Sequence, residues 1–381
     1  MTLRDPRWLL PCVVGALGAG LIGFNALPIV VGALVDGAGL EPSRAGWLGS
    51  LELAGMAVSA LMLAPRIGTL SLRRLGLGAA LLAALAHGLS AWVDGFVALA
   101  ALRLLAGLGE GAIVGVGNAL IAASRDPDRF AARVEIVGGF AAALLLVALP
   151  YAAVLGAQRG VFLAMAAVVC VCMPVIAWIP DRRLAARPTV DLGIAFGPRA
   201  LPVLAAGFLL TSGESAIWAF LERIGVHVGV APASIGLLLG ASTVLGLLGA
   251  GLAAWLGTRF GRRIPFVLGI SAQALACWAV VHATTASPYV VASLGYALTF
   301  FFVQPYLIGT AAVVDPQGRV VAAYAGVVLV GGSLGPAIGG ALVGWFSYPA
   351  LGWQLVFASA AAILAILPLA TALDREAAGP G

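Results

Sequence analysis

Residues 103–111 read Arg-Leu-Leu-Ala-Gly-Leu-Gly-Glu-Gly and lie in the middle of a segment, 96–123, that contains no other charged residue. A run of about 20 apolar residues is long enough to cross a hydrocarbon core of ~30 Å as a helix. A charge at the centre of such a helix costs roughly 2.5 to 3.5 kcal/mol on insertion scales, so a charge found there is usually functional. The segment therefore predicts a membrane-spanning helix with a functional guanidinium and carboxylate.

Arg103 and Glu110 lie seven residues apart, on the same face of this predicted helix. With a rise of about 1.5 Å per residue they are separated by ~10 Å, which is too far for a direct ion pair. Each group therefore needs a partner on another helix or in a water-filled cavity. Gly107 and Gly111, followed one turn later by Gly115, form a stripe of small residues that lets a neighbouring helix approach closely.

The composition extends this interpretation to the whole chain. Its 381 residues are 62% hydrophobic and only 10% charged, with a mean hydropathy of +1.07, whereas soluble domains contain about 25% charged residues. We therefore expect an all-α integral membrane protein surrounded by lipid. No basic soluble segment suggests a nucleic-acid partner. The three His are not spaced as metal ligands, so neither a metal nor another cofactor is expected.

Long apolar runs separated by short polar breaks predict twelve transmembrane helices. Their approximate bounds are 8–35, 43–63, 75–93, 96–123, 132–156, 160–179, 200–226, 233–257, 264–286, 288–314, 320–346 and 350–373.

The Arg residues predict how these helices are oriented. All 21 basic residues are Arg. If the twelve segments alternate in direction, Arg103 lies inside the membrane, Arg44, Arg159 and Arg223 lie on one side, and all the others lie on the opposite side. Basic residues concentrate in cytoplasmic loops. We therefore expect both termini in the cytoplasm, in a bacterial-type plasma (inner) membrane.

A polar-leaning segment divides the chain near its midpoint. It predicts two six-helix bundles, 1–180 and 200–381, joined by a cytoplasmic linker, 181–199. The halves resemble each other at an offset of roughly 190 residues, since Pro42-Ser-Arg-Ala-Gly46 opens the second predicted helix and Pro232-Ala-Ser-Ile-Gly236 opens the eighth. Two such bundles, related by an axis along the membrane normal, are a known transporter plan with the solute site between them.

The motifs resemble those of the major facilitator superfamily of secondary transporters, and the resemblance covers essentially the whole chain. Arg103-x-x-x-Gly107-x-Gly109 is similar to the family's pattern on helix four, whose Arg is implicated in proton transfer in relatives. The resemblance implies the family's fold of twelve helices in two pseudo-symmetric bundles. It also implies alternating access to a central site.

A second motif lies in the loop after the eighth predicted helix. It reads Thr258-Arg259-Phe-Gly261-Arg262-Arg263 and is similar to the end of the family's Gly-x-x-x-Asp-Arg-x-Gly-Arg-Arg loop, with Thr258 in place of the Asp. In the family this loop helps to hold one conformation. The resemblance therefore implies a conformational role for Arg259, Gly261 and Arg262.

The third motif is Gly331-x-x-x-Gly335-Pro336-x-x-Gly339-Gly340, on the eleventh predicted helix. In the family this pattern marks helix five of proton-driven exporters, so here it occupies the equivalent helix of the other half. We expect these residues to form a narrow face that packs against a neighbouring helix. The resemblance favours export.

Four charged residues inside predicted helices are candidates for proton coupling. They are Glu52, Arg103, Glu110 and Glu214. A buried carboxylic acid can exchange a proton when its surroundings change, and the chain has no Lys to do so. The alternative for each is a structural ion pair. Four further residues are candidates to line a solute cavity, with plain packing or a helix kink as the alternative: Asn25, Trp218, Gln304 and Tyr306.

The predicted function is secondary active transport of a small organic solute by alternating access. The solute is expected to be neutral, amphipathic or cationic, because carboxylates outnumber buried Arg. Proton-coupled export by a monomer is the first prediction, and proton-coupled uptake of a small metabolite is the alternative. A channel or a membrane-embedded enzyme would be other classes. Ser212 beside Gly213 loosely resembles an intramembrane protease motif, but no His is placed to serve it, so no enzyme is expected.

Overall fold

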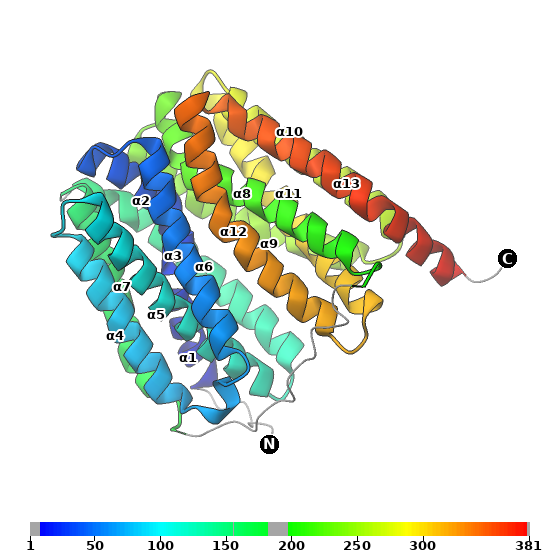
Figure 1. Ribbon diagram of the computed structural model, residues 1–381, viewed down its shortest axis with the longest axis horizontal. Coiled ribbons are helices and arrows are strands. Elements are labelled where there is room, and N and C mark those ends of the chain that lie inside the picture. The colour runs from blue at the N-terminus through cyan, green and yellow to red at the C-terminus, as the bar shows by residue number, and fades with distance from the viewer. Residues whose placement is uncertain (1–7, 155, 182–196, 379–381) are drawn as a thin grey trace. The chain divides into compact units, whose positions relative to one another are not determined.

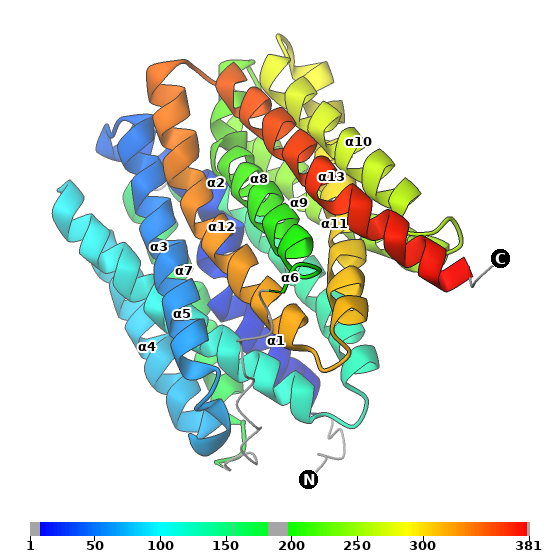
Figure 2. The ribbon, with the colours of Figure 1, turned by 45° about the vertical axis from the view of Figure 1, so that its right-hand side comes forward.

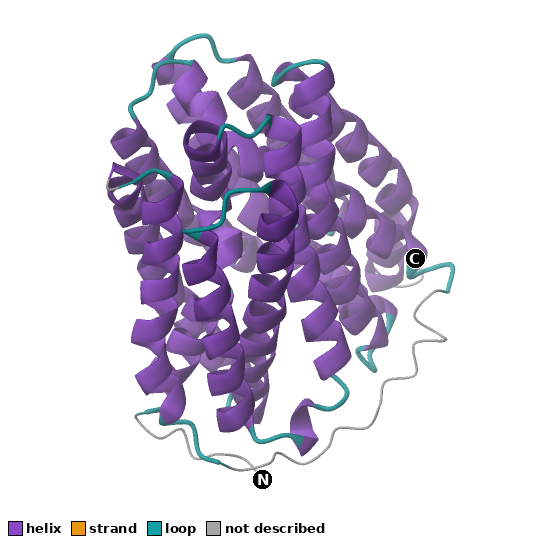
Figure 3. Cartoon of the chain, turned by 60° about the vertical axis from the view of Figure 1, so that its left-hand side comes forward, coloured by secondary structure: helices purple, strands orange, loops and turns teal. Residues whose placement is uncertain are grey.

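The computed structural model describes residues 8–154, 156–181 and 197–378. Within these ranges the chain forms helices joined by short connections, without a named strand (Figure 3). Twelve segments of this part are long and apolar enough to cross a membrane, which confirms the predicted all-α membrane architecture. The helices are α1 (Leu9–Gly20), α2 (Ile22–Ala38), α3 (Pro42–Leu63), the 3₁₀ turn η1 (Ile67–Thr69), α4 (Leu72–Ser90), α5 (Phe96–Ala123), α6 (Pro127–Val154), α7 (Gln158–Ala177), α8 (Leu201–His227), α9 (Pro232–Leu256), α10 (Arg263–His282), α11 (Ala286–Val314), α12 (Arg319–Trp345) and α13 (Pro349–Ala378).

The chain divides into two compact units, residues 1–189 (unit 1) and 190–381 (unit 2). Most of the predicted linker, 182–196, lies outside the described residues. In unit 1, α5 packs against α3 and α4, and α4 also packs against α7 (Figures 1 and 2). In unit 2, α11 packs against α9 and α10, and α10 packs against α13. The second, third, fourth and sixth spans of the two units therefore pair in the same way.

The first span is two helices, not the single helix that its apolar run predicted. α1 ends at Gly20 and α2 begins at Ile22, because the backbone of Leu21 (φ −102°, ψ 8°) leaves the helical region. At this break the span comes close to α5. A Cβ on Gly20 would lie 2.9 Å from the carbonyl oxygen of Glu110, so only glycine fits there. Breaks at glycines are a common cause of bent helices.

Glycines hold α5 directly against α3. A Cβ added to Gly107 would overlap the carbonyl group of Glu52, and one added to Gly111 would overlap the carbonyl oxygen of Met56. From the other side, a Cβ on Gly55 would lie 2.5 Å from the carbonyl oxygen of Leu104. The two backbones are therefore in contact, which brings the middle of α3 close to the charged residues of α5.

The glycines of α12 lie against α8. A Cβ on Gly335 would lie 2.5 Å from the carbonyl oxygen of Ser212, and a Cβ on Gly339 would lie 3.1 Å from the Cβ of Ala216. Pro336 and Gly340 are buried on the same helix. These positions agree with a narrow packing face on α12.

The loop between α9 and α10 is attached to the end of α13. Gly261 has a positive φ of 67°, and a Cβ there would lie 2.6 Å from a carboxylate oxygen of Asp374. That carboxylate accepts the backbone N–H groups of Arg262, at 2.7 Å, and Arg263, at 3.0 Å. Arg259 lies 5.3 Å above the ring of Trp255. Asp374 thus caps the start of α10, as Asp residues commonly do for helices.

Unit 1 has a similar arrangement at the start of α4. The hydroxyl of Ser71 donates to Asp181, which follows α7, and the guanidinium of Arg74 binds the same carboxylate at 3.1 Å. The Ser71 hydrogen bond and the Arg74 charge lower the pKa of Asp181 from its ordinary value. In both units, a carboxylate that follows or ends the sixth span therefore binds the start of the third span.

Candidate functional site

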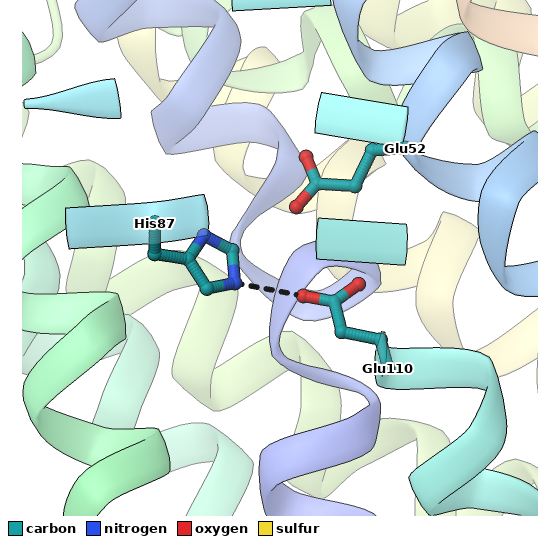
Figure 4. A group of neighbouring side chains, drawn as sticks. All are labelled: Glu52, His87 and Glu110. Carbon is teal, nitrogen blue, oxygen red and sulfur yellow. Dashed lines mark hydrogen bonds and ion pairs between the residues drawn. The ribbon is translucent and has the colours of Figure 1, made fainter. Parts of the chain in front are cut away.

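Four charged or titratable side chains meet inside unit 1. They are Glu52 of α3, His87 of α4, and Arg103 and Glu110 of α5, and none is more than 1% exposed. Figure 4 shows Glu52, His87 and Glu110 pointing toward one another from three helices. The close packing of α3 on α5 through glycine makes this meeting possible. We call these four residues the unit-1 cluster.

Arg103 lies at the centre of the unit-1 cluster. One of its terminal nitrogens donates to Glu52 Oε1 at 3.0 Å and lies 3.1 Å from Nδ1 of His87. The other terminal nitrogen donates to the hydroxyl of Ser90 at 2.6 Å. The guanidinium also lies 4.3 Å from the centre of the Phe162 ring, within the range of a cation–π contact. Arg103 thus has partners on α3, α4 and α7.

His87 links Arg103 to Glu110. A guanidinium can only donate hydrogen bonds, so Nδ1 of His87 must accept and carries no proton. The proton of a neutral ring then lies on Nε2, which faces Glu110 Oε1 at 2.9 Å. This tautomer follows from the partners of the two ring nitrogens. His87 is therefore neutral; it accepts a hydrogen bond from Arg103 and donates one to Glu110.

The sequence analysis considered His87 only as one of three His that are not spaced as metal ligands, and did not place it beside the charged residues of α5. Helix α4 ends at Ser90, yet the packing of α4 on α5 buries His87 completely and turns it toward Glu110. The only sequence signal is that His87 lies three residues before Ser90, on the same side of the helix. Both side chains bind Arg103.

The two carboxylates of the unit-1 cluster each have an oxygen without a partner. Oε2 of Glu52 and Oε2 of Glu110 are buried and make no hydrogen bond. Gly23 of α2 lies beside both carboxylates, since a Cβ there would be 2.7 Å from Oε1 of Glu52 and 2.6 Å from Oε2 of Glu110. With Arg103 positive, His87 neutral and both carboxylates ionised, the unit-1 cluster would carry one net negative charge. A single proton would make it neutral.

The unit-1 cluster also has the spacing of a metal site. Ligand atoms of Glu52, His87 and Glu110 lie within 4.8 Å of one another. Arg103, however, already provides the cation beside them. A His that binds a metal usually donates its other N–H to an acceptor, whereas Nδ1 of His87 faces a donor. The geometry therefore favours a polar cluster centred on the guanidinium over a metal site.

A second polar group lies inside unit 2. Glu214 of α8 accepts a short hydrogen bond from the amide of Gln273 of α10, and Gln304 of α11 is close enough to interact with the same carboxylate. Tyr324 of α12 donates to Gln304 Oε1 at 2.8 Å, and Tyr296 donates to the backbone oxygen of Glu214 at 3.2 Å. We call these five residues the unit-2 cluster. The sequence analysis identified Glu214 and Gln304 and missed the other three.

The other three predicted cavity residues, Asn25, Trp218 and Tyr306, belong to neither cluster. Asn25 is half-buried on α2, and Trp218 is half-buried on α8, one turn after Glu214. Tyr306 belongs to the apolar core of unit 2, with its ring centre 5.4 Å from that of Phe302. Although Gln304 and Tyr306 are two residues apart, only Gln304 reaches the unit-2 cluster, because residues at this spacing do not share a helix face.

Sequence comparison finds a family match in unit 2. A family model described as the Major Facilitator Superfamily matches residues 203–380. This half of the chain is therefore similar to the major facilitator superfamily. Together with the twelve spans, the match indicates a multi-pass membrane transporter of a small solute, not an enzyme. No curated protein matches it in sequence.

Solved structures support the same fold over nearly the whole chain. It is similar to a mutant of the nucleoside transporter NupG, with a TM-score of 0.78 and 13% identity over 95% of this chain and 98% of that chain. A second structure of NupG gives a TM-score of 0.76 and 12% identity over 96% and 99%. At this low sequence identity the similarity shows the fold alone and does not identify the solute.

Proposed function

We propose that this protein couples transport of a small organic solute to protons by alternating access. The observation that supports the proposal most strongly is the unit-1 cluster, which needs one proton to be neutral. Burying an uncompensated charge is costly, so a proton bound here stabilises the closed interior. A conformation that admits water would remove this requirement and release the proton.

Glu110 is the proposed proton carrier within the unit-1 cluster. Glu52 is bound directly to the guanidinium of Arg103 at 3.0 Å, which favours its ionised form. Glu110 contacts no guanidinium and instead faces the neutral His87. Two conformations that differ in their affinity for a proton at Glu110 would provide the coupling, because a ligand shifts an equilibrium only through differential affinity. In this proposal Arg103 assists release by approaching Glu110.

The proposed direction is export across a bacterial-type plasma membrane, by a monomer with both termini in the cytoplasm. The family resemblance of the Gly331–Gly340 motif supports export. Uptake is the second candidate, because this motif lies on the eleventh span and not on the fifth, where exporters of the family carry it. Transport into and out of vesicles of known orientation, with the pH gradient imposed in either direction, distinguishes the two.

The coupling proposal can be tested in proteoliposomes that contain a pH-sensitive dye. The solutes are phenethylammonium, an organic cation, and uridine, a neutral nucleoside. For whichever is transported, wild-type protein should show solute-dependent proton movement and gradient-driven accumulation. Glu110→Gln should reduce the solute-dependent proton movement and the gradient-driven accumulation at least tenfold, while passive solute exchange continues.

Glu135→Gln is the matched control, because it changes an exposed carboxylate of another spanning helix, α6. This variant should transport as the wild type does. Gradient-driven accumulation with ordinary pH dependence in Glu110→Gln would show that the proton carrier is elsewhere. The same measurement on Glu52→Gln and Glu214→Gln would then identify it.

A further inference from the structure

The carboxylate of Glu214 differs from that of Glu52 in having no cationic partner. In the described part of unit 2, the side chains that interact with it are the carboxamides of Gln273 and Gln304. It is only 2% exposed, so water does not compensate its charge in this conformation. A buried carboxylate without a cation must either hold a proton or be matched by a positive ligand.

Two buried oxygens of the unit-2 cluster lack hydrogen-bond partners. They are Oε2 of Glu214 and Oε1 of Gln273. Both belong to acceptor groups, and the hydrogen bond that joins the two side chains uses Oε1 of Glu214 and the amide nitrogen of Gln273. A buried polar atom without a hydrogen-bond partner destabilises the folded protein. The group that would complete this site is therefore a hydrogen-bond donor with at least two N–H or O–H bonds.

Aromatic side chains lie near Glu214. Tyr296 binds the backbone of Glu214, and its ring centre lies 6.5 Å from that of Phe300. Tyr324 donates to Gln304, which lies beside Glu214, and Trp218 follows Glu214 by one turn on α8. The faces of aromatic rings attract cations, most strongly when water is excluded. A carboxylate with free acceptors and nearby aromatic rings is chemically suited to an ammonium group.

We infer that the unit-2 cluster binds an organic ammonium ion, whose N–H groups donate to Glu214 and Gln273. This inference rests on the proposed function in one respect, because it takes the bound ammonium ion to be the transported solute. A neutral donor would satisfy the two oxygens but would leave the charge of Glu214 uncompensated. An ammonium ion would satisfy the two oxygens and would also compensate the charge of Glu214. Among the described residues, the titratable groups that face Glu214 from neighbouring helices are Cys277, Tyr296 and Tyr324, none of which is a cation.

The inference can be tested by direct binding to the full-length protein in lipid nanodiscs, without any pH gradient. The probe is phenethylammonium, and its neutral counterpart is 2-phenylethanol, which has the same ring and chain but no charge. Phenethylammonium should raise the Tm of the wild type, because a ligand stabilises the state that it binds, and 2-phenylethanol should not. Glu214→Gln should weaken phenethylammonium binding at least tenfold.

Glu214→Gln preserves the size of the side chain and an acceptor for Gln273, and the Tm of the empty protein shows whether it folds. Gln273→Leu is a second variant, which removes one acceptor and should weaken binding by about two- to tenfold. Glu135→Gln should bind as the wild type does. Binding of phenethylammonium that is unchanged in both cluster variants, or binding of uridine alone, would overturn the inference. Because no gradient is used, this result is independent of proton coupling.

Discussion

Arg103 gives Glu52 its only compensating charge within the described residues of unit 1. The two groups are 3.0 Å apart, and neither is more than 1% exposed. Removing one partner of a buried ion pair costs about 3 to 5 kcal/mol, whereas removing both costs much less. The unit-1 cluster therefore makes Arg103 important for stability as well as for the proposed coupling.

We expect Arg103→Gln to lower the free energy of unfolding by about 3 to 5 kcal/mol at pH 8. The double variant with Glu52→Gln should recover at least half of this loss, because position 52 then carries no unpaired charge. Equilibrium unfolding in mixed detergent micelles measures both values. Additive losses in the double variant would mean that the pair is not coupled energetically.

Asp315, between α11 and α12, provides a residue-scale prediction outside the membrane-spanning segments. Its carboxylate accepts from the guanidinium of Arg319 at 2.8 Å and from the backbone N–H of Arg319 at 2.7 Å. These hydrogen bonds lower the pKa of Asp315 well below its ordinary value. A lowered pKa stabilises the folded state above the unfolded-state pKa of about 3.9, and this stabilisation is lost as the pH falls through the folded-state pKa.

Asp315→Asn should therefore lower the Tm at pH 7. The difference from the wild type should shrink steadily as the pH is lowered below about 4, where the carboxylate begins to take up a proton even in the unfolded chain. Thermal unfolding between pH 7 and pH 3 measures it. A difference that stays constant over this range would mean that Asp315 acts through its shape and not its charge.

At the scale of helices, glycine contacts decide which side chains meet. The contact of Gly107 with the backbone of Glu52 places α3 directly on α5, and the unit-1 cluster depends on this distance. Gly115, two turns further along the same helix, has much more space, since a Cβ there would meet only Ile67 at 3.5 Å. The stripe that looked uniform in the sequence is therefore tight at one end and open at the other.

We expect Gly107→Ala to reduce the yield of folded protein several-fold, because the added Cβ has no space beside a backbone carbonyl. Gly115→Ala, the matched control, should be tolerated. Size-exclusion profiles of detergent-solubilised protein measure the folded fraction. Equal yields for the two variants would show that α3 and α5 can separate without loss of the fold.

At the scale of the whole molecule, the distribution of Arg predicts that the linker faces the cytoplasm. Thr189, which lies outside the described residues, is a suitable position for labelling. In a variant whose exposed Cys170 and half-buried Cys172 are replaced by Ser, Thr189→Cys should resist an impermeant thiol reagent added to intact cells. Thr284→Cys, in a loop predicted to lie outside, should be labelled. The reverse pattern would invert the predicted topology.

The sequence by itself determined the number of spans, the all-helical class and the family resemblance. These features can be read from the sequence because each membrane crossing needs about 20 consecutive apolar residues, whose backbone groups hydrogen-bond to one another within the helix. The charged residues inside those runs could also be found, because Glu52, Arg103, Glu110 and Glu214 interrupt an apolar pattern. Their partners could not be identified, because partners lie on other helices.

Only the tertiary structure decided how these residues are combined. It buried His87 beside Arg103, joined Gln273 to Glu214, and placed Asp374 against the loop of Gly261. These pairs are separated by 16 to 112 residues, and no local period or motif relates them. They form because close glycine packing and helix rotation set which side chains face one another. That arrangement gives Glu52 a guanidinium and leaves Glu214 without one.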